Sequence, residues 1–291
     1  MKFDMHCHTK EGSLDGKVMI EEYIRQLKRM GFGGMLVSDH NSYDGYREWK
    51  NSLKGKEYTD FVVLKGVEYD TLDCGHMLII MPVGVKLRIL EMRGLPIAVL
   101  IRIVHRYGGI IGPAHPYGEK YLSAVTTRER KRKYSRQGNK KLIEQFDFIE
   151  IYNACEKHEV NLKAARLAQK YGCPGFGGSD AHKPDCIGKG WTDLPETIRN
   201  ENDLIAYIRE RPHIRCGGSF YDSTVRDKLG KWNVVRLDGF FFYNKLGAAS
   251  KRRKRKKELK RIYPEYKEIR KKTEDDSETA GAGQNFVENQ R

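Results

Sequence analysis

The feature that most restricts the fold is an alternation of short apolar runs with amphipathic stretches over residues 1–216. The stretches 18–30, 96–107 and 162–171 have apolar residues at helical spacing, and a glycine follows each of them. Strands that alternate with helices are typical of a parallel sheet built from βα units. About seven such units predict a barrel rather than a short open sheet. The predicted strands are Lys2–Cys7, Gly34–Ser38, Phe61–Glu68, Met77–Met81, Gly109–Pro113, Phe146–Tyr152, Gly175–Gly178 and Ile214–Cys216.

The alternation stops after residue 216. Residues 217–250 have aromatic and turn residues with weak periodicity, and we expect an accessory segment there. Residues 251–291 form a basic and then polar tail, whose composition predicts that it is largely disordered.

Basic residues are concentrated in two segments. Residues 251–272 hold thirteen Lys and Arg against three Glu, and residues 128–141 hold eight against one. The net charge of the whole chain is +15, so everything outside these segments is close to neutral. Because each neutralised phosphate strengthens polyanion binding, the two segments favour nucleic acid as a partner over a small phosphate ester. A solvated, disordered arm is the alternative interpretation of each segment.

Several observations bear on the compartment. No apolar run approaches the roughly 18 residues that a membrane span needs, and the N-terminal stretch lacks the apolar core of a signal peptide. The six cysteines are scattered, without a CxxC pair, as is typical of reduced thiols. We therefore expect a cytoplasmic protein that makes no membrane contact.

Histidines and acids gather at the ends of the predicted strands. His6 and His8 are two residues apart on the first strand, so their side chains share one face, while Cys7 points away from it. The carboxyl ends of the strands in a parallel barrel meet at one face, where the other side chains should join them. Imidazole nitrogens and carboxylate oxygens suit zinc, manganese or iron, so the pattern predicts a metal site and a buried Cys7 thiol outside it. The side chains at the later strand ends are His40, Glu68, His76, His115, Asp180 and His182.

Six stretches then resemble a known family. In chain order, DMHCHT, LVSDHN, GVEYD, GHMLI, GPAHP and GGSDAH are similar to the motifs of the PHP (polymerase and histidinol phosphatase) superfamily, over about residues 1–216. The resemblance implies an α/β protein with a distorted (βα)7 TIM-like barrel. It also implies two or three divalent ions, of zinc, manganese or iron, that support hydrolysis of phosphoester bonds.

The resemblance also implies which residues hold the ions. One ion would be bound by His6, His8, Glu68 and Asp180. Glu68 would bridge to a second ion that His76 and His115 also hold. A third ion would be bound by His40, His182 and a carboxylate of the first loop.

Two kinds of assignment are less direct. We choose Asp15 as the first-loop carboxylate because LDG keeps the family's Asp–Gly turn, with Glu11 as the competitor. Asp4 and Asp39 would orient the ligand imidazoles from behind. Four residues beside the ligand motifs are candidates for contacts with phosphate oxygens, namely Lys10, Asn41, Asn153 and Lys183.

The expected activity is metal-dependent hydrolysis of phosphoester bonds in nucleotides or oligonucleotides, as a phosphatase or a nuclease. A hydroxide held by the ions would attack phosphorus, so no side-chain nucleophile is needed. One alternative is a phosphatase of small metabolites that resembles histidinol phosphatase. Another is a non-catalytic PHP module that binds nucleic acid and uses its metals for structure.

Overall fold

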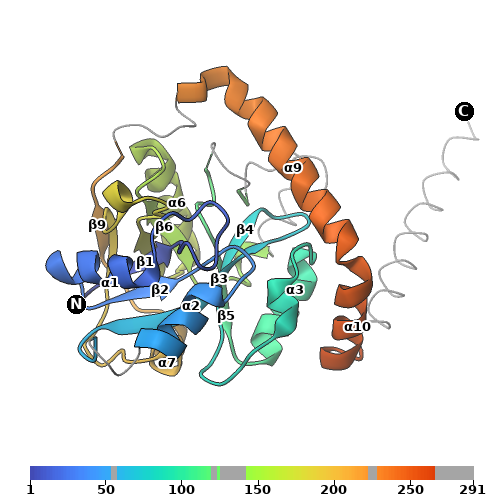
Figure 1. The fold of residues 1–291 in the computed structure, drawn as a ribbon, viewed down its shortest axis with the longest axis horizontal. Helices are drawn as coiled ribbons and strands as arrows, with labels where there is room; N and C mark the ends of the chain where they lie inside the picture. The colour runs from blue at the N-terminus through green and yellow to red at the C-terminus, as the bar shows by residue number, and fades with distance from the viewer. Residues whose placement is uncertain (54–57, 119–122, 125–141, 222–227, 266–291) are drawn as a thin grey trace, which may run out of the picture. The chain divides into compact units, whose positions relative to one another are not determined.

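Strands of two sheets surround the interior of the protein in this computed structural model (Figure 1). Seven strands form one curled sheet in the order β5–β4–β3–β2–β1–β8–β9, and β6 pairs with β7. The structure describes residues 1–53, 58–118, 123–124, 142–221 and 228–265. The strands are β1 Lys2–Cys7, β2 Gly34–Val37, β3 Val62–Asp70, β4 His76–Ile80, β5 Ile110–Pro113, β6 Ile149–Asn153, β7 Gly175–Gly178, β8 Gly190–Asp193 and β9 Cys216–Gly218.

The two sheets are joined along both of their edges. Asp147, just before β6, donates its backbone N–H to Ile111 of β5 over 2.9 Å. On the other side, Asp180 after β7 donates to the carbonyl of His6 on β1, also over 2.9 Å. The interior between the sheets holds a buried apolar cluster in which the rings of Phe148 and Phe176 stack 4.3 Å apart.

The sheet is mixed, although an all-parallel arrangement was expected. β1, β2 and β3 are parallel neighbours, and so are β6 and β7. The pairs β3–β4 and β4–β5 are antiparallel, as are β1–β8 and β8–β9. Five residues, 71–75, join β3 to β4, which is too short for the crossover of about a dozen residues that parallel neighbours need. The α/β class is confirmed, but a regular βα repeat does not extend through the described residues.

The antiparallel β4 changes how one predicted ligand reaches the common face. His76 lies at the start of β4 rather than at its end. Because β4 runs against β3, His76 pairs with Asp70 at the carboxyl end of β3. The imidazole therefore arrives at the same edge as the residues that end the parallel strands.

Three helices lie where apolar periodicity predicted them, namely α1 Ile20–Arg29, α3 Ile97–Arg106 and α6 His158–Tyr171. The prediction missed β8 and several helices. One of these, α7, begins at a capping box in which Asn200 and Asp203 bond each other's backbone, a signal present in the sequence. The remaining helical segments are α2 Asp44–Glu48, η1 Trp49–Leu53, η2 Arg88–Glu91, η3 Pro184–Cys186, α7 Glu201–Arg209, η4 Gly230–Trp232, α9 Asn233–Ser250 and α10 Arg252–Ile262.

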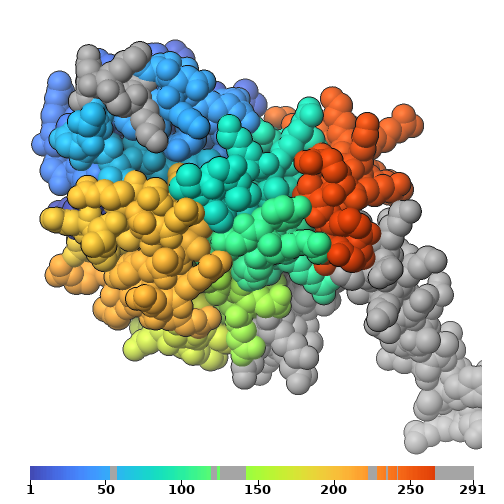
Figure 2. Space-filling model, turned by 90° about the horizontal axis from the view of Figure 1, so that it is seen from below, coloured from blue at the N-terminus to red at the C-terminus, as the bar shows by residue number. Residues whose placement is uncertain are grey.

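Helices α3 and α7 cover neighbouring parts of one face. Seen from below, the segments that contain them lie side by side on the surface (Figure 2). The guanidinium of Arg209, the last residue of α7, donates to the carbonyl of Gly108, just after α3, over 2.9 Å.

The C-terminal part of the chain contains two helices that apolar periodicity did not reveal. The chain divides into two units, Met1–Ala249 and Ser250–Arg291. The expected accessory segment 217–250 therefore belongs almost entirely to the first unit, where it contributes β9 and α9. In the second unit, the basic run forms α10. Residues 266–291, predicted to be disordered, and the basic segment 128–141 lie outside the described residues.

Two other expectations concern cysteines and membranes. All six cysteines are free thiols, and Cys7 is completely buried against α1, as predicted. Among the helices that the structure describes, none combines the length and apolar character of a membrane span.

Phe148 provides a test of the interior packing. Its side chain is fully buried, so Phe148→Ala should lower the free energy of unfolding by about 3–5 kcal/mol through lost burial and a cavity. The matched substitution Phe242→Ala removes a ring that is 66% exposed. It should change the free energy of unfolding by less than about 0.5 kcal/mol. Urea unfolding followed by circular dichroism measures both. Equal losses would contradict the assigned interior.

Candidate metal centre

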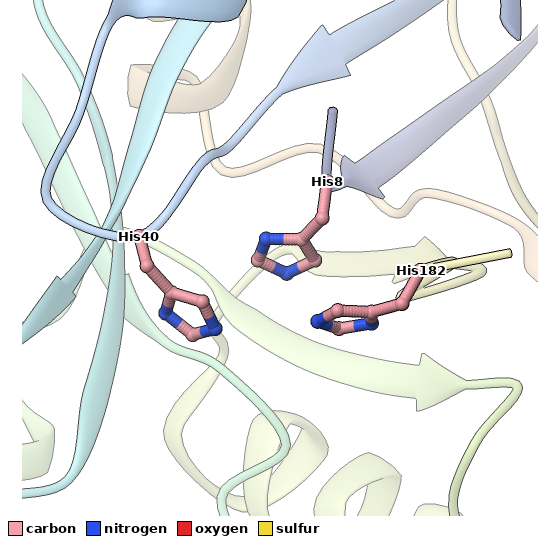
Figure 3. A group of neighbouring side chains, drawn as sticks. All are labelled: His8, His40 and His182. Atoms are coloured by element: carbon pink, nitrogen blue, oxygen red, sulfur yellow. The ribbon is translucent and has the colours of Figure 1, made fainter. Parts of the chain in front are cut away.

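The strand ends bring six histidines together in one cluster, in which four are buried and His40 and His182 are half-buried. Figure 3 shows three of them, His8 after β1, His40 after β2 and His182 after β7, with their rings turned toward one another. The ring of His8 lies 4.6 Å from that of His40 and 4.2 Å from that of His182. Segments far apart in the sequence thus supply a single site, as the strand-end pattern predicted.

Glu68, on β3, lies at the middle of the cluster. Its Oε1 is 3.0 Å from Nδ1 of His76 and 3.2 Å from Nε2 of His115. Its Oε2 is 3.3 Å from Nε2 of His8 and 3.5 Å from Nε2 of His6. One carboxylate therefore borders two groups of donor atoms, each close enough together to share an ion.

Asp180 completes the first of these groups. Its Oδ1 lies 3.3 Å from Nε2 of His8 and 3.7 Å from Nε2 of His6. The loop after β7 holds Asp180 with a positive φ of 51°, and His115 has a φ of 29°. Positive φ is costly for residues other than glycine and occurs where the surrounding structure enforces it, often at functional sites.

The structure distinguishes the two competing first-loop carboxylates. Oδ2 of Asp15 lies 3.3 Å from Nε2 of His182 and 4.0 Å from Nε2 of His40. Both carboxylate oxygens of Glu11 instead accept from the backbone N–H of Ile20, at the start of α1. Of the two, Asp15 is therefore the one that lies at the histidine cluster.

Four imidazoles are fixed through Nδ1, so that Nε2 faces the centre. His6 donates Nδ1–H to Glu150 over 2.8 Å, and His182 donates to the carbonyl of Asp180 over 3.0 Å. His8 and His115 bond the hydroxyls of Ser13 and Ser123, each over 3.2 Å. Hydrogen bonds of this kind set the tautomer and direction of a metal-binding histidine.

His76 provides a direct test of whether the site fits metal ions. Both its ring nitrogens are buried and lack a well-aligned hydrogen bond among the described residues, although Glu68 is 3.0 Å from Nδ1. Buried nitrogens without hydrogen bonds are costly, and a shared cation would satisfy them. The residues therefore fit divalent ions.

Opposite charges at the cluster shift several pKa values. Burial alone would raise the pKa of Glu68, but His76, His40 and His6 outweigh it and hold that pKa well below its usual range. Burial alone would lower the pKa of His40, but Glu68 and Asp70 raise it to about 10. Protons thus occupy nitrogens that a metal ion would use, so metal binding releases protons and strengthens as the pH rises.

Two residues that the sequence prediction missed support the ligands. Glu150 on β6 accepts from the ring of His6 and from the backbone N–H of His115. Asp70 on β3 lies 3.5 Å from Nδ1 of His40 and 3.5 Å from Nε2 of His76. Asp70 lies two residues after Glu68 on β3, so period-two alternation was the available signal for it.

The structure corrects the predicted role of Asp4. Its carboxylate accepts from the backbone N–H groups of His6 and Ser179 and from the Ser179 hydroxyl, so it joins β1 to β7 and does not bond an imidazole. Asp39 does act toward an imidazole, because it accepts from the Ser13 hydroxyl that bonds His8.

The four candidates for substrate contact divide into two pairs. The amide of Asn153 donates to Glu150 and Asp180, and the amide oxygen of Asn41 accepts from the backbone N–H of Asp70. Both buried amides therefore hold the framework of the site. Lys10 is exposed, and Lys183 is half-buried and pairs with Asp185 at 3.7 Å.

Comparison with known families agrees with this geometry. The family model described as PHP domain matches residues 4–148, and the one described as PHP-associated matches residues 158–212. These ranges include every predicted ligand, from His6 to His182. The chain belongs to the PHP superfamily of metal-dependent phosphoesterases. No curated protein matches it in sequence.

Solved structures share the fold at low sequence identity. PsfC from Pseudomonas syringae has a TM-score of 0.55 and 17% identity, covering 83% of this chain and 98% of that one. A candidate metal-dependent phosphoesterase from Bifidobacterium adolescentis has a TM-score of 0.52 and 16% identity, and the match covers 72% of this chain and 96% of that one. A lesion-specific endonuclease from Pyrococcus furiosus has a TM-score of 0.51 and 15% identity, and the match covers 74% of this chain and 57% of that one.

Glu150 tests the hydrogen bonds behind the histidines. Glu150→Gln keeps the side-chain size but weakens its hold on the His6 ring, so it should reduce metal affinity by about 10- to 100-fold. Titration of the metal-free protein with Zn²⁺ or Mn²⁺ in a calorimeter measures the change. Glu159→Gln, on the exposed surface of α6, is the matched control. Unchanged affinity in Glu150→Gln would show that Glu150 does not support the site.

Proposed function

We propose that this protein is a metal-dependent hydrolase that cleaves phosphoester bonds in nucleotides or oligonucleotides. The observation that carries the proposal is the placement of Glu68 between two groups of buried donors, one with His6, His8 and Asp180 and one with His76 and His115. A third group of His40, His182 and Asp15 lies beside them. Together these residues would hold two or three divalent ions.

The residues of the chain would prepare the site before substrate arrives. Divalent ions bound there would neutralise phosphoryl oxygens and lower the pKa of a coordinated water molecule, which supplies the nucleophile. Glu150, Ser13 and Ser123 hold the imidazoles so that Nε2 faces inward. Asn153 fixes Asp180 through its amide. Because these groups are already oriented, little reorganisation is needed when substrate binds.

The basic helix α10 favours a nucleic acid substrate over a small metabolite. Arg252, Arg253, Lys254, Lys256 and Lys257 are all exposed on it. Exposed cations in a row suit a chain of phosphates, each of which adds to the binding energy. A lesion-specific endonuclease shares this fold, so chemistry on nucleic acid is compatible with it.

Two other functions account for fewer of the observations. A phosphatase of small metabolites, similar to histidinol phosphatase, would use the same centre but has no need of the cations of α10. A non-catalytic module that binds nucleic acid would need metal only for structure. The mostly buried donor set, with hydrogen bonds that orient its imidazoles, favours catalysis over this second alternative.

Loss of a ligand tests the proposed chemistry. His8→Ala and Asp180→Ala should each lower the turnover of bis-p-nitrophenyl phosphate and p-nitrophenyl phosphate by more than roughly 100-fold. Losing a residue that only supports a metal ligand costs up to about 100-fold in activity, and losing a ligand itself should cost more. His105→Ala removes a histidine that pairs with Asp147 outside the cluster and should keep the activity. Near wild-type turnover in His8→Ala, with the fold intact by circular dichroism, would contradict the mechanism.

The cations of α10 can be tested by salt dependence. Changing Lys254, Lys256 and Lys257 to Gln should weaken the binding of a 5′-labelled single-stranded oligonucleotide. It should also reduce the slope of log K against log salt by about 2. The matched control changes three exposed lysines around α6, Lys157, Lys163 and Lys170, to Gln. Equal slopes in the two variants would contradict a role for α10, and turnover of small esters without oligonucleotide binding would favour the metabolite phosphatase.

A further inference from the structure

Helix α9 turns one side toward the body of the protein and the opposite side toward solvent. On the inner side, the amide oxygen of Asn244 accepts from Arg93 over 2.7 Å, and Asn244 is 8% exposed. On the outer side, Val235, Phe242 and Leu246 are 61%, 66% and 70% exposed. Single exposed apolar side chains are normal on a protein surface, but a continuous row of them marks a surface for interaction.

The exposed residues repeat at the spacing that pairs one helix with another. Along the outer side of α9 the intervals alternate between four and three residues, and a tryptophan that is 74% exposed stands three residues before the first of them. A seven-residue repeat with two apolar positions keeps these positions on one stripe that faces a second helix. We call this stripe the α9 seam, and its residues, all exposed, are Trp232, Val235, Gly239, Phe242, Leu246 and Ala249.

Gly239 lies at the middle of the α9 seam. Glycine destabilises the interior of a helix relative to alanine, so its presence there needs a reason. A Cβ atom at this position would meet no atom of the neighbouring elements within 4 Å, so packing among the described residues does not require glycine. A missing side chain allows a backbone or a large side chain to approach closely. Gly239 is therefore explained by a partner that packs against the seam from outside.

Two copies of the α9 seam fit each other when the helices run antiparallel about a twofold axis. In one register, Gly239 of each copy lies opposite Phe242 of the other, and Val235 lies opposite Leu246. The same register places the first and last residues of the seam, a tryptophan and an alanine, opposite each other. Large side chains then face small ones at both ends and at the middle, which fills the space between the two helices.

Charged residues beside the seam select the same register. Asp238 and Lys245 are exposed and lie seven residues apart on one flank of the seam. In the register described, Asp238 of each copy faces Lys245 of the other, which gives two pairs of opposite charge. Moving one copy by seven residues instead brings Asp238 against Asp238, or Lys245 against Lys245. Both side chains also interact within their own chain, so the selection depends on the sign of their charges and not on unmet hydrogen bonds.

The area of the seam indicates how tightly two copies would associate. A standard protein interface buries about 800 Å² on each partner. A fully buried aromatic side chain contributes roughly 150–250 Å², so Trp232 and Phe242, at 74% and 66% exposure, would contribute roughly 200–350 Å² per copy. With the aliphatic residues the seam stays below the standard size, in the range of weak and transient complexes.

We propose that the α9 seam is a homodimerisation surface, on which the same helix of a second copy of this chain packs antiparallel about a twofold axis. A second copy accounts for three separate observations, namely the exposed apolar row, the glycine at its middle and the opposite charges on one flank. Helix α9 lies outside both family matches, which end at residue 212, so the dimer would be a property of this chain's added segment.

Sedimentation velocity of the full-length protein tests the association. Between about 1 and 300 μM, which spans the affinities of weak interfaces, the average mass should rise from 33.7 kDa toward twice that value. Leu246→Glu should weaken the association by more than about tenfold, because it places two carboxylates in the apolar seam. The matched control, Leu162→Glu, changes a leucine of α6 that is 42% exposed and should leave the association unchanged.

Reversal of the flanking charges tests the register. Asp238→Lys and Lys245→Asp should each weaken self-association by about tenfold, because each replaces two pairs of opposite charge with two pairs of like charge. An equimolar mixture of the two variants should associate like the wild type, since the two lysines of one variant then face the two aspartates of the other. Circular dichroism verifies that each variant is folded.

Each alternative outcome is decisive. A monomer at every concentration would overturn the inference, and so would self-association that Leu246→Glu leaves unchanged. A mixture of the charge variants that associates no better than either variant alone would also overturn it. A monomer that binds a single-stranded oligonucleotide, with the binding lost in Leu246→Glu, would assign the α9 seam to nucleic acid instead.

Discussion

The structure of the centre depends on one buried carboxylate. Glu68 is almost completely buried, and imidazole nitrogens of five histidines lie within 3.0–3.5 Å of its oxygens. Burying a lone carboxylate costs several kcal/mol, so its surroundings must supply compensating charge. Here the ends of β1, β2, β4 and β5 meet around β3 and bring that charge. The mixed sheet is therefore suited to concentrating imidazoles about a single acid, which is also the arrangement that clustered divalent ions require.

The hydrogen bonds behind the ligands explain how such a crowded group keeps one arrangement. Glu150, Ser13 and Ser123 each engage an Nδ1 atom, and Asp39 in turn bonds Ser13. These bonds decide which nitrogen faces inward. Helix α9 also borders the cluster, because the ring of Phe240 lies 6.4 Å from that of His76.

Much of the fold and of the histidine cluster could be predicted from the sequence, because strand-end histidines and period-two alternation are local signals. The burial of Cys7 and the strands from β1 to β7 followed from them, apart from small shifts of the ends. The antiparallel direction of β4 could not be predicted from these signals, since it depends on the length of the short turn between β3 and β4. Asn153 was expected to meet substrate, but its amide bonds Glu150 on its own strand and Asp180 after β7, and the second of these contacts depends on how β6 pairs with β7. In helix α9 the apolar and polar residues are not separated onto opposite faces, so periodicity gave no signal for it.

The central claim is that one carboxylate joins separate metal sites, and the metal content of Glu68→Gln tests it most directly. Wild type and variant are stripped of metal, loaded with Mn²⁺ or Zn²⁺, freed of excess ion by gel filtration and analysed by inductively coupled plasma mass spectrometry. The account predicts more than one ion per chain in the wild type and the loss of bound metal in Glu68→Gln, with the fold retained by circular dichroism. Full metal content in the folded variant would contradict it.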